Sequence, residues 1–505
     1  MTRRPGHWLL VALWCLATFS GSHAQAPDGR LIDAVKRGDV AGVRALLAQR
    51  VDLAAADADG STALHWAAHG NNLELVDLLL DAGADARTST RYKVTPLYFA
   101  AQNGNAAVMA RLLDAGADPN GTVYEGQTML MTAALAGKAD AVRLLLTRGA
   151  TVDVAEPYRG QTALMWAAAE GNADAAAVLV EAGADIRKKS TGGFTPLLFA
   201  VRNAHIPVTV RLLDLGADVN DVAPDGSSAL SVATVNAYFE LASVLLDRGA
   251  NPNLTDPRGS PLHAVAWLRK PGADGAAGVG GTPQGTPQPV GRVTALQLAK
   301  KMLEKGANPN ARLSRGPLKR HHDAGSTLNL GEGTTPLIRA ARTNDVASMK
   351  ALLEAGADPF LTLPDRTNAL MVAAGQGAGG LRGEGIRIVV PTPEGAAEAV
   401  QLLIDQGMDV DAFNNAGNTA LHAAVNRGDA VVKILVSHGA RLVKNKAGFT
   451  PLDLALGRGG RGGRGGAVRE STAEILRPLA ARGGQPSDAP APGRSGRPSG
   501  PPSPR

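Results

Sequence analysis

The chain has 505 residues, of which 44% are hydrophobic, 4% aromatic and 19% charged, and its formal net charge is +6. Residues 458–505 supply nine arginines against three acids, and residues 1–24 add two arginines and no acid, so residues 25–457 carry a net charge near −2. This distribution excludes a body built as a basic surface for nucleic acid. The single cysteine, Cys15, lies in the N-terminal segment, so residues 25–505 have no thiol to serve as a disulfide partner, nucleophile or metal ligand.

Residues 1–24 have the features of a secretory signal peptide. Arg3 and Arg4 provide a positive start, residues 8–19 form an apolar run, and residues 22–24 place small side chains where signal peptidase reads them. The apolar run is too short to remain as a transmembrane anchor. We therefore expect an exported protein, periplasmic or secreted, with no transmembrane segment and with Gln25 as its first mature residue.

A short phrase recurs along the chain with a period close to 33 residues. Its clearest copies begin at Thr62, Thr95, Thr128, Thr162 and Thr195, which are separated by 33, 33, 34 and 33 residues. Most copies are followed about twenty residues later by Gly-Ala-Asp or a close variant. A fixed period of this length is typical of stacked supersecondary units, so the question of function moves from catalysis to surface recognition.

Each repeat has the same predicted internal structure. A Gly-containing turn leads to the Thr, whose hydroxyl can cap a short Ala-rich helix such as residues 64–69, and Pro often follows the Thr. A brief turn then opens a longer helix with a Leu stripe, such as residues 73–80. Gly83 and its equivalents are predicted to stop this second helix by adopting a left-handed conformation.

This pattern resembles the ankyrin repeat family over nearly the whole of residues 25–482. We count about twelve repeats, with residues 30–55 as an N-terminal cap (repeat 1), Thr62 in repeat 2, and residues 447–481 as a C-terminal cap (repeat 12). The resemblance implies an all-α repeat solenoid of stacked helix–turn–helix units, with hairpin-like fingers between them and a concave face made by fingers and first helices. The leader and the high Ala, Gly and Arg usage favour a bacterial source.

Departures from the pattern are confined to the second half of the chain. Insertions at residues 271–292, 377–395 and 458–469 fall between the two helices of repeats 8, 10 and 12, and a fourth at residues 311–332 falls in a finger. Such loops usually mark a face where additions do not disturb stacking, and a second partner-binding edge is the alternative. Residues 483–505, with seven prolines, are predicted to form a disordered tail.

The chemically suggestive residues are few. His65, His263 and His422 share one repeat position, where the resemblance implies a buried structural histidine, and the adjacent His321 and His322 lack the further ligands that a metal site needs. The sequence contains no nucleophile elbow, no His-Glu-x-x-His and no phosphate loop. We therefore predict no catalytic residue, no metal site, no cofactor and no enzymatic activity.

Arginine alternates with glycine pairs over residues 458–466, in a pattern that resembles RNA-binding segments. It has only three copies, contains no aromatic residue and belongs to a chain predicted to be exported, so we expect no nucleic-acid partner. A flexible basic loop is the better interpretation. Such a loop could make a weak contact between the basic C-terminal region and anionic envelope polymers or lipid head groups.

The best candidate binding surface is a row of aromatic residues on the fingers. Tyr92, Tyr124 and Tyr158 occupy nearly the same finger position in repeats 3, 4 and 5, and Phe194 follows in repeat 6. Either each ring packs on its neighbour and stiffens the finger, or the rings are amphipathic anchors of the kind enriched at binding hot spots. The positions expected to join them are Glu125, Gln127, Arg159 and Gln161 on fingers, and Gln102, Asn103, Glu170, Arg202 and Asn203 at first-helix ends. Trp66, Phe99, Trp166 and Phe199 recur within first helices and are expected in the core.

These observations favour a non-catalytic protein–protein interaction scaffold that acts outside the cytoplasm and binds another protein through the concave face. The alternative is a binder of anionic envelope polymer or lipid head groups through the Arg/Gly-rich C-terminal segment, with strong salt dependence. An enzyme would need a polar pocket with convergent titratable groups, which the sequence does not indicate.

Overall fold

The computed structural model describes residues 29–257, 259–268, 291–314, 331–376, 393–458 and 467–482. The chain divides into two compact parts, residues 1–129 with 147–150, and residues 130–146 with 151–505. We call these the first part and the second part and describe each by itself. The predicted leader, the predicted tail, His321 and His322, and the greater part of all four predicted insertions lie outside the described residues.

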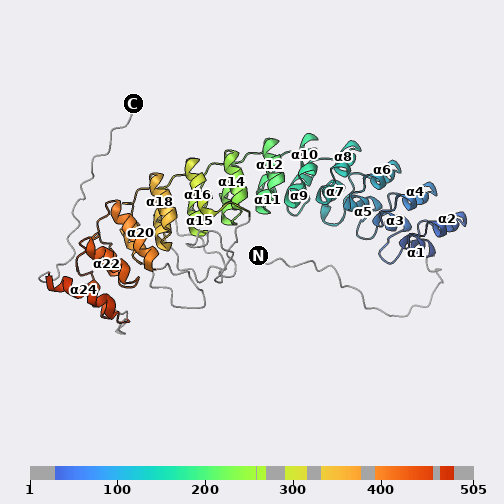
Figure 1. The fold of residues 1–505 in the computed structure, drawn as a ribbon. Coiled ribbons are helices and arrows are strands. Elements are labelled where there is room, and N and C mark those ends of the chain that lie inside the picture. The colour runs from blue at the N-terminus through green and yellow to red at the C-terminus, as the bar shows by residue number, and fades with distance from the viewer. Residues whose placement is uncertain are drawn as a thin grey trace, which may run out of the picture. The chain divides into compact units, whose positions relative to one another are not determined.

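The first part consists of helix pairs, each made of a shorter first helix and a longer second helix (Figure 1). Its finger before Thr128 also contains one turn of 3-10 helix, Tyr124–Gly126. The pairs are α1 (Arg30–Lys36) with α2 (Val40–Ala48), α3 (Ala63–His69) with α4 (Leu73–Asp81), and α5 (Pro96–Asn103) with α6 (Ala106–Asp114).

The second part continues the same pairing (Figure 1), and the first residue of α7 and the last of α8 are assigned to the first part. The pairs are α7 (Met129–Ala136) with α8 (Ala139–Thr147), α9 (Ala163–Glu170) with α10 (Ala173–Glu181), α11 (Pro196–Arg202) with α12 (Ile206–Asp214), α13 (Ala229–Val235) with α14 (Phe239–Asp247), α15 (Pro261–Leu268) with α16 (Ala295–Glu304), α17 (Pro336–Thr343) with α18 (Val346–Glu354), α19 (Ala369–Ala373) with α20 (Pro393–Asp405), α21 (Ala420–Ala424) with α22 (Asp429–Ser437), and α23 (Pro451–Ala455) with α24 (Glu470–Arg482).

The prediction of an all-α repeat solenoid is confirmed. The described residues contain 24 α-helices and no β-strand, and the helices form twelve pairs. Over the described ranges, the fingers contribute only isolated antiparallel bridges, such as Ala56 with Thr62 and Val222 with Ser228.

Where the recurring phrase begins with Thr, that residue is the N-cap of the first helix in α3, α5, α9, α11, α17, α21 and α23, whereas Ser228 caps α13 and Asn368 caps α19. The Thr95 hydroxyl accepts a hydrogen bond from the Tyr98 N–H, and Thr195 does the same for Leu198. The following Pro lies at the first helical position, where its missing N–H would have no helical partner. At the other end of the repeat, Gly83 and Gly216 both have φ of 97°, in the left-handed region that ends a helix.

The core is built from small residues in first helices and leucines in second helices. Ala67, Ala68, Ala100 and Ala101 are at most 1% exposed, which lets neighbouring helices approach closely. The second-helix leucines are equally buried at equivalent positions: Leu79, Leu112, Leu145, Leu179, Leu212 and Leu245. Chain stability therefore comes from tight helix packing, in which aromatic residues have little share.

Asparagine side chains link successive repeats at the residue two positions after the Gly-Ala-Asp phrase. In the second part, the Asn253 amide donates to the Gly306 carbonyl at 2.8 Å and its oxygen accepts from the Asn308 N–H at 2.8 Å. Asn310 makes the same two bonds to Gly356 and Asp358, at 3.0 and 2.8 Å. Each such amide satisfies backbone groups of the next repeat, which fixes the spacing between repeats.

In repeat 9 this position holds Phe360, whose ring is 59% exposed and has no amide to offer. We expect Phe360→Asn to restore the link and raise the free energy of unfolding by about 1 kcal/mol, the usual net gain from one or two hydrogen bonds. Urea unfolding of the full chain measures this. Phe360→Ala is the matched control, because it removes the exposed ring without adding an amide. Equal stability of the Asn and Ala variants would contradict the role given to these asparagines.

Candidate protein-interaction face

The fingers are held in defined conformations by backbone hydrogen bonds. In the first part, the Asp57 N–H donates to the Ser61 carbonyl at 3.0 Å, and the Arg91 N–H of the next finger donates to the Asp59 carbonyl at 3.2 Å. In the second part, the Thr191 N–H donates to the Arg159 carbonyl at 2.8 Å. Adjacent finger tips are thus tied to one another, so side chains on them are presented from a fixed backbone.

The three finger tyrosines are exposed. Tyr92 is 54% exposed, Tyr124 70% and Tyr158 67%, so more than half of each residue is open to solvent. Tyr124 lies in the 3-10 turn, followed by Glu125 with φ of 67°, a left-handed value uncommon for a residue other than Gly. The Arg91 guanidinium lies 5.0 Å from the centre of the Tyr92 ring. Tyr92 and Tyr124 belong to the first part, whereas Tyr158 and Phe194 belong to the second.

In the first part, the first helices add a run of ring contacts that the sequence did not predict. The Lys36 ammonium lies 4.1 Å from the Trp66 ring, Trp66 contacts His69 edge-on at 5.6 Å, and His69 contacts Phe99 at 5.1 Å. The expectation that Trp66 and Phe99 belong to the core is wrong, because both are only half-buried. Trp66 reaches the finger, because its indole N–H donates to the Asp57 carboxylate at 2.9 Å, whereas the Phe99 ring contacts His69 and Tyr98 on the first helices.

The second part carries a comparable cluster. The Phe194 ring on the finger lies 6.0 Å from the Phe199 ring on α11, and the Arg202 guanidinium lies 5.9 Å from Phe194. Trp166 and Phe199 are also half-buried, which corrects the same core expectation. The Trp166 indole nitrogen is buried and has no hydrogen-bond acceptor.

Glu156 explains how the Tyr158 finger keeps its shape. Its carboxylate accepts hydrogen bonds from the backbone N–H groups of Tyr158, Arg159 and Gln161, at 2.7 to 3.0 Å. Burial raises the pKa of this carboxyl, but those hydrogen bonds outweigh burial and leave the pKa below its usual value. The finger is therefore closed around an ionised carboxylate, which directs Tyr158 outward.

The other predicted site residues lie on fingers or first-helix ends, and they differ in how exposed they are to solvent. Gln127, Gln161 and Phe194 are half-buried, and the following residues are exposed: Glu125, Arg159, Gln102, Asn103, Glu170, Arg202 and Asn203. Two of these already have a structural role, because the Asn103 amide donates to the Ala68 and His69 carbonyls at 3.2 and 3.1 Å, and the Asn203 amide donates to the Ala169 carbonyl at 2.6 Å. A partner would contact these two while they hold neighbouring helices together.

The repeated histidines are structural. The His65 Nδ1 accepts from the Thr62 N–H at 3.1 Å, while Nε2 donates to the Val94 carbonyl of the next finger at 3.1 Å. His263 and His422 make the same pair of bonds, to Ser260 and Thr334 and to Thr419 and Phe449. An imidazole that accepts at one nitrogen and donates at the other is neutral. Burial lowers the pKa of all three, and that of His263 to about 4.

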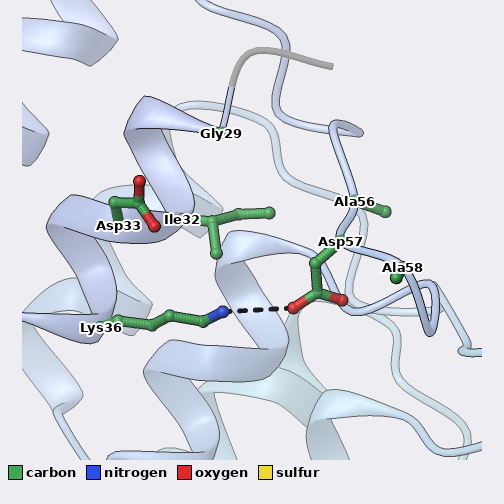
Figure 2. A pocket seen from close by; sticks show the side chains of 7 residues that line it. All are labelled: Gly29, Ile32, Asp33, Lys36, Ala56, Asp57 and Ala58. Atoms are coloured by element: carbon green, nitrogen blue, oxygen red, sulfur yellow. Dashed lines mark hydrogen bonds and ion pairs between the residues drawn. The ribbon is translucent and has the colours of Figure 1, made fainter. Parts of the chain in front are cut away.

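A pocket of about 330 Å³ opens where α1 meets the first finger (Figure 2). Lys36 and Asp57 point toward each other across it, 3.3 Å apart. Partial burial raises the pKa of Asp57, but hydrogen bonds donated to its carboxylate by the Trp66 indole, the Lys36 ammonium and the Ser61 N–H outweigh it and hold the pKa at about 2. Because the carboxylate stays ionised and paired, it is poorly suited to accept or donate a proton at neutral pH.

Within the part of the chain that the structure describes, we also looked for a metal site, a membrane-spanning helix and the Arg/Gly-rich segment. No group of three or more His, Cys, Asp or Glu side chains there is placed to hold a metal ion. None of the described helices is long and apolar enough to cross a membrane. Of the Arg/Gly-rich segment, Arg458 is described and pairs with Asp453 at 3.1 Å, whereas residues 459–466 lie outside the described residues.

Helix pairs joined by hairpin fingers, repeated every 33 residues or so, define a class of stacked repeat scaffold that presents an extended binding surface. Family models agree: a model of three ankyrin repeats matches residues 31–123, 119–190, 187–256 and 387–463, and a single-repeat model matches residues 332–362. These matches cover more than half of the chain, and the chain belongs to the ankyrin repeat family. The repeats indicate a protein–protein interaction scaffold whose partners are proteins, and nothing in the matches indicates enzymatic activity.

Individual relatives share only short stretches. Osteoclast-stimulating factor 1 from Xenopus laevis is 38% identical over 64 residues, which cover 13% of this chain and 30% of that protein. The same protein from Sus scrofa is 38% identical over 63 residues, covering 12% and 29%. The chain thus spans less than a third of the length of these relatives. The crystal structure of the human ASB11 ankyrin repeat domain is 27% identical, with a TM-score of 0.40, and its match covers 44% of this chain and 98% of that domain.

Proposed function

We propose that the chain binds a protein partner through its fingers and the adjoining faces of its first helices. The observation that carries this proposal is that three of its five tyrosines stand on finger tips with more than half of each side chain exposed. Tyrosine combines a large apolar ring with a polar tip and is enriched at binding hot spots. Because the finger backbone is fixed beforehand, little conformational entropy is lost when a partner is bound.

The charges on the second helices support this choice of face. In the first part, Arg111 pairs with Asp77 and Asp81, and in the second part Lys301 pairs with Asp247 at 2.6 Å. These pairs join the second helices of successive repeats, so their charged groups are engaged within the chain. The aromatic side chains described above lie instead on fingers and first helices. Each compact part carries its own exposed aromatic side chains, so the proposal does not depend on how the two parts are arranged.

We further propose that binding takes place outside the cytoplasm. Support comes from residues 1–24, with their paired arginines, short apolar run and small residues before Gln25. We keep as a separate prediction that the basic C-terminal region contacts anionic surfaces. An association that weakens as salt is added would support it.

Site-specific photo-crosslinking in whole cells tests both proposals. A photoreactive amino acid replaces Tyr92 in the first part or Tyr158 in the second, and matched controls carry it at Arg44 on α2 or Arg143 on α8, which are also exposed. We expect a discrete adduct with one partner protein from the tyrosine positions, in the envelope or the medium. Adducts of equal yield from the second-helix controls would contradict the proposed face, and adducts confined to the cytosol would contradict export.

A further inference from the structure

Three exposed arginines on fingers or at a first-helix end lie against aromatic rings, and we call them the ring-associated arginines. Their guanidiniums lie 5.0, 5.9 and 5.7 Å from the ring centres, in the pairs Arg91 with Tyr92, Arg202 with Phe194, and Arg366 with Phe413. The first pair belongs to the first part, and the other two belong to the second. A cation is attracted to the face of a ring at such distances, which limits how the guanidinium can turn.

Each pair has at least one member that is held in place. The Arg91 N–H donates to the Asp59 carbonyl of the preceding finger at 3.2 Å. In repeat 10, the Asp365 carbonyl, one residue before the arginine, accepts from the Asn415 N–H of the next finger at 2.8 Å. In repeat 6 the ring is held instead, because it also contacts the Phe199 ring at 6.0 Å.

The ring-associated arginines have no acidic partner. Over the described ranges, no hydrogen bond or ion pair joins any of their guanidiniums to a carboxylate. Acidic side chains of the same fingers accept hydrogen bonds within their own turns. The Asp59 carboxylate accepts from the Ser61 N–H at 3.0 Å, and the Asp365 carboxylate accepts from the Thr367 N–H at 2.9 Å. These acids therefore stabilise the fingers and leave the guanidiniums without a counterion.

Arginines of the second helices differ in this respect. Every arginine within α2, α6, α8 and α12 forms an ion pair, and the pairs are Arg44 with Glu74, Arg111 with Asp77, Arg143 with Asp140, and Arg211 with Glu181. The chain thus supplies acids to the arginines of these second helices and none to the ring-associated arginines. The latter are available to carboxylates from another molecule.

We propose that the ring-associated arginines recognise carboxylates of an acidic segment of the protein partner. This inference rests on the proposed function, and it names the chemistry that the partner presents to the fingers. The planar fork of a guanidinium is suited to two parallel hydrogen bonds with a carboxylate. A ring that limits the motion of the guanidinium reduces the entropy lost when those bonds form. Complementary charge would then select acidic partners and reject basic ones.

Crosslinking of a synthetic peptide to the full chain tests the proposal. A photoreactive phenylalanine replaces Tyr92, Phe194 or Phe413, one position at a time, so each adduct reports binding beside one ring-associated arginine. The probe is a peptide of four Glu-Glu-Leu units, and the reference is the same peptide with Gln in place of Glu. We expect adducts at all three positions to favour the Glu peptide and to weaken as salt is added.

Removal of each arginine should act only at its own ring. Arg91→Gln is expected to lower the yield at position 92 at least about threefold, as the loss of one exposed charge pair predicts, and to leave positions 194 and 413 unchanged. Arg202→Gln should do the same at position 194, and Arg366→Gln at position 413. The matched controls are Arg44→Gln and Arg211→Gln, which remove the same charge from second helices and should change none of the three yields.

Equal yields with the Glu and Gln peptides would overturn the inference. So would yields that the three Arg→Gln variants leave unchanged, once circular dichroism has shown that they are folded, because the basic C-terminal region would then be what binds the acidic peptide. Neither result depends on a natural partner. If they occur while adducts with a partner protein still form in cells at Tyr92 and Tyr158, the proposed function stands and only the acidic chemistry is wrong. Absence of those cellular adducts contradicts the proposed function itself.

Discussion

Acidification from pH 6.5 to pH 4 is expected to cost about 3 kcal/mol of folding free energy through His263 alone. Burial, and then the positive charge of Arg339, lower its pKa from 6.5 to about 4. Between these two values the unfolded chain binds a proton at this site that the folded chain does not. The stabilisation is therefore complete above pH 6.5 and is lost as the pH falls toward 4. Asp57, a carboxyl group with a pKa of about 2, loses most of its stabilising contribution only below pH 4.

The matched variant is His263→Gln. Glutamine serves at the same position in α16, where the Gln297 oxygen accepts from the Thr294 N–H at 2.8 Å, so the helix cap is expected to survive. Urea unfolding at several values of pH should show a shallower loss of stability between pH 6.5 and 4 in the variant. His65 and His422, whose pKa values are also lowered, contribute to the loss that remains, and Glu156 contributes near the acid end of this range. Parallel pH profiles of the wild type and the variant would contradict the role assigned to His263.

The repeat period and its cap residues sufficed to predict the helices. Thr95 and Thr195 cap helices because a hydroxyl before an Ala-rich run satisfies backbone N–H groups that the helix leaves free. Gly83 and Gly216 end helices because they adopt positive φ without a steric cost. Both rules are local in sequence, so a single chain is enough to apply them.

The sequence was less informative wherever the outcome depends on which way a side chain turns. Trp66 and Phe99 were expected in the core because they recur in an apolar helix, yet alanine and leucine fill the interior and both rings are only half-buried. The Trp66 indole N–H donates instead to Asp57 on the finger. The hydrogen bond from the Arg427 guanidinium to the Asn344 side-chain oxygen joins residues 83 positions apart. No periodic pattern predicts such a contact, because it depends on a departure from the repeat.

For the finger tyrosines, the sequence left two possibilities open: rings packed on their neighbours, or rings presented to a partner. Exposures of 54% to 70% favour the second. The backbone explains the difference, because Glu125 takes a left-handed conformation and Glu156 closes its finger from inside. Neither feature follows from the identity of the tyrosines themselves.

The most direct test of the proposed interaction face is the affinity of the triple variant Tyr92→Ala, Tyr124→Ala and Tyr158→Ala for the partner identified by crosslinking. We expect binding at least about 30-fold weaker than that of the wild type, the effect of losing one good hot spot. The free energy of unfolding should change little, because the rings are exposed. A variant with Arg44 and Arg143 replaced by Ala serves as the control and should bind as the wild type does. Unchanged affinity of the triple tyrosine variant, with its fold intact, would contradict the account.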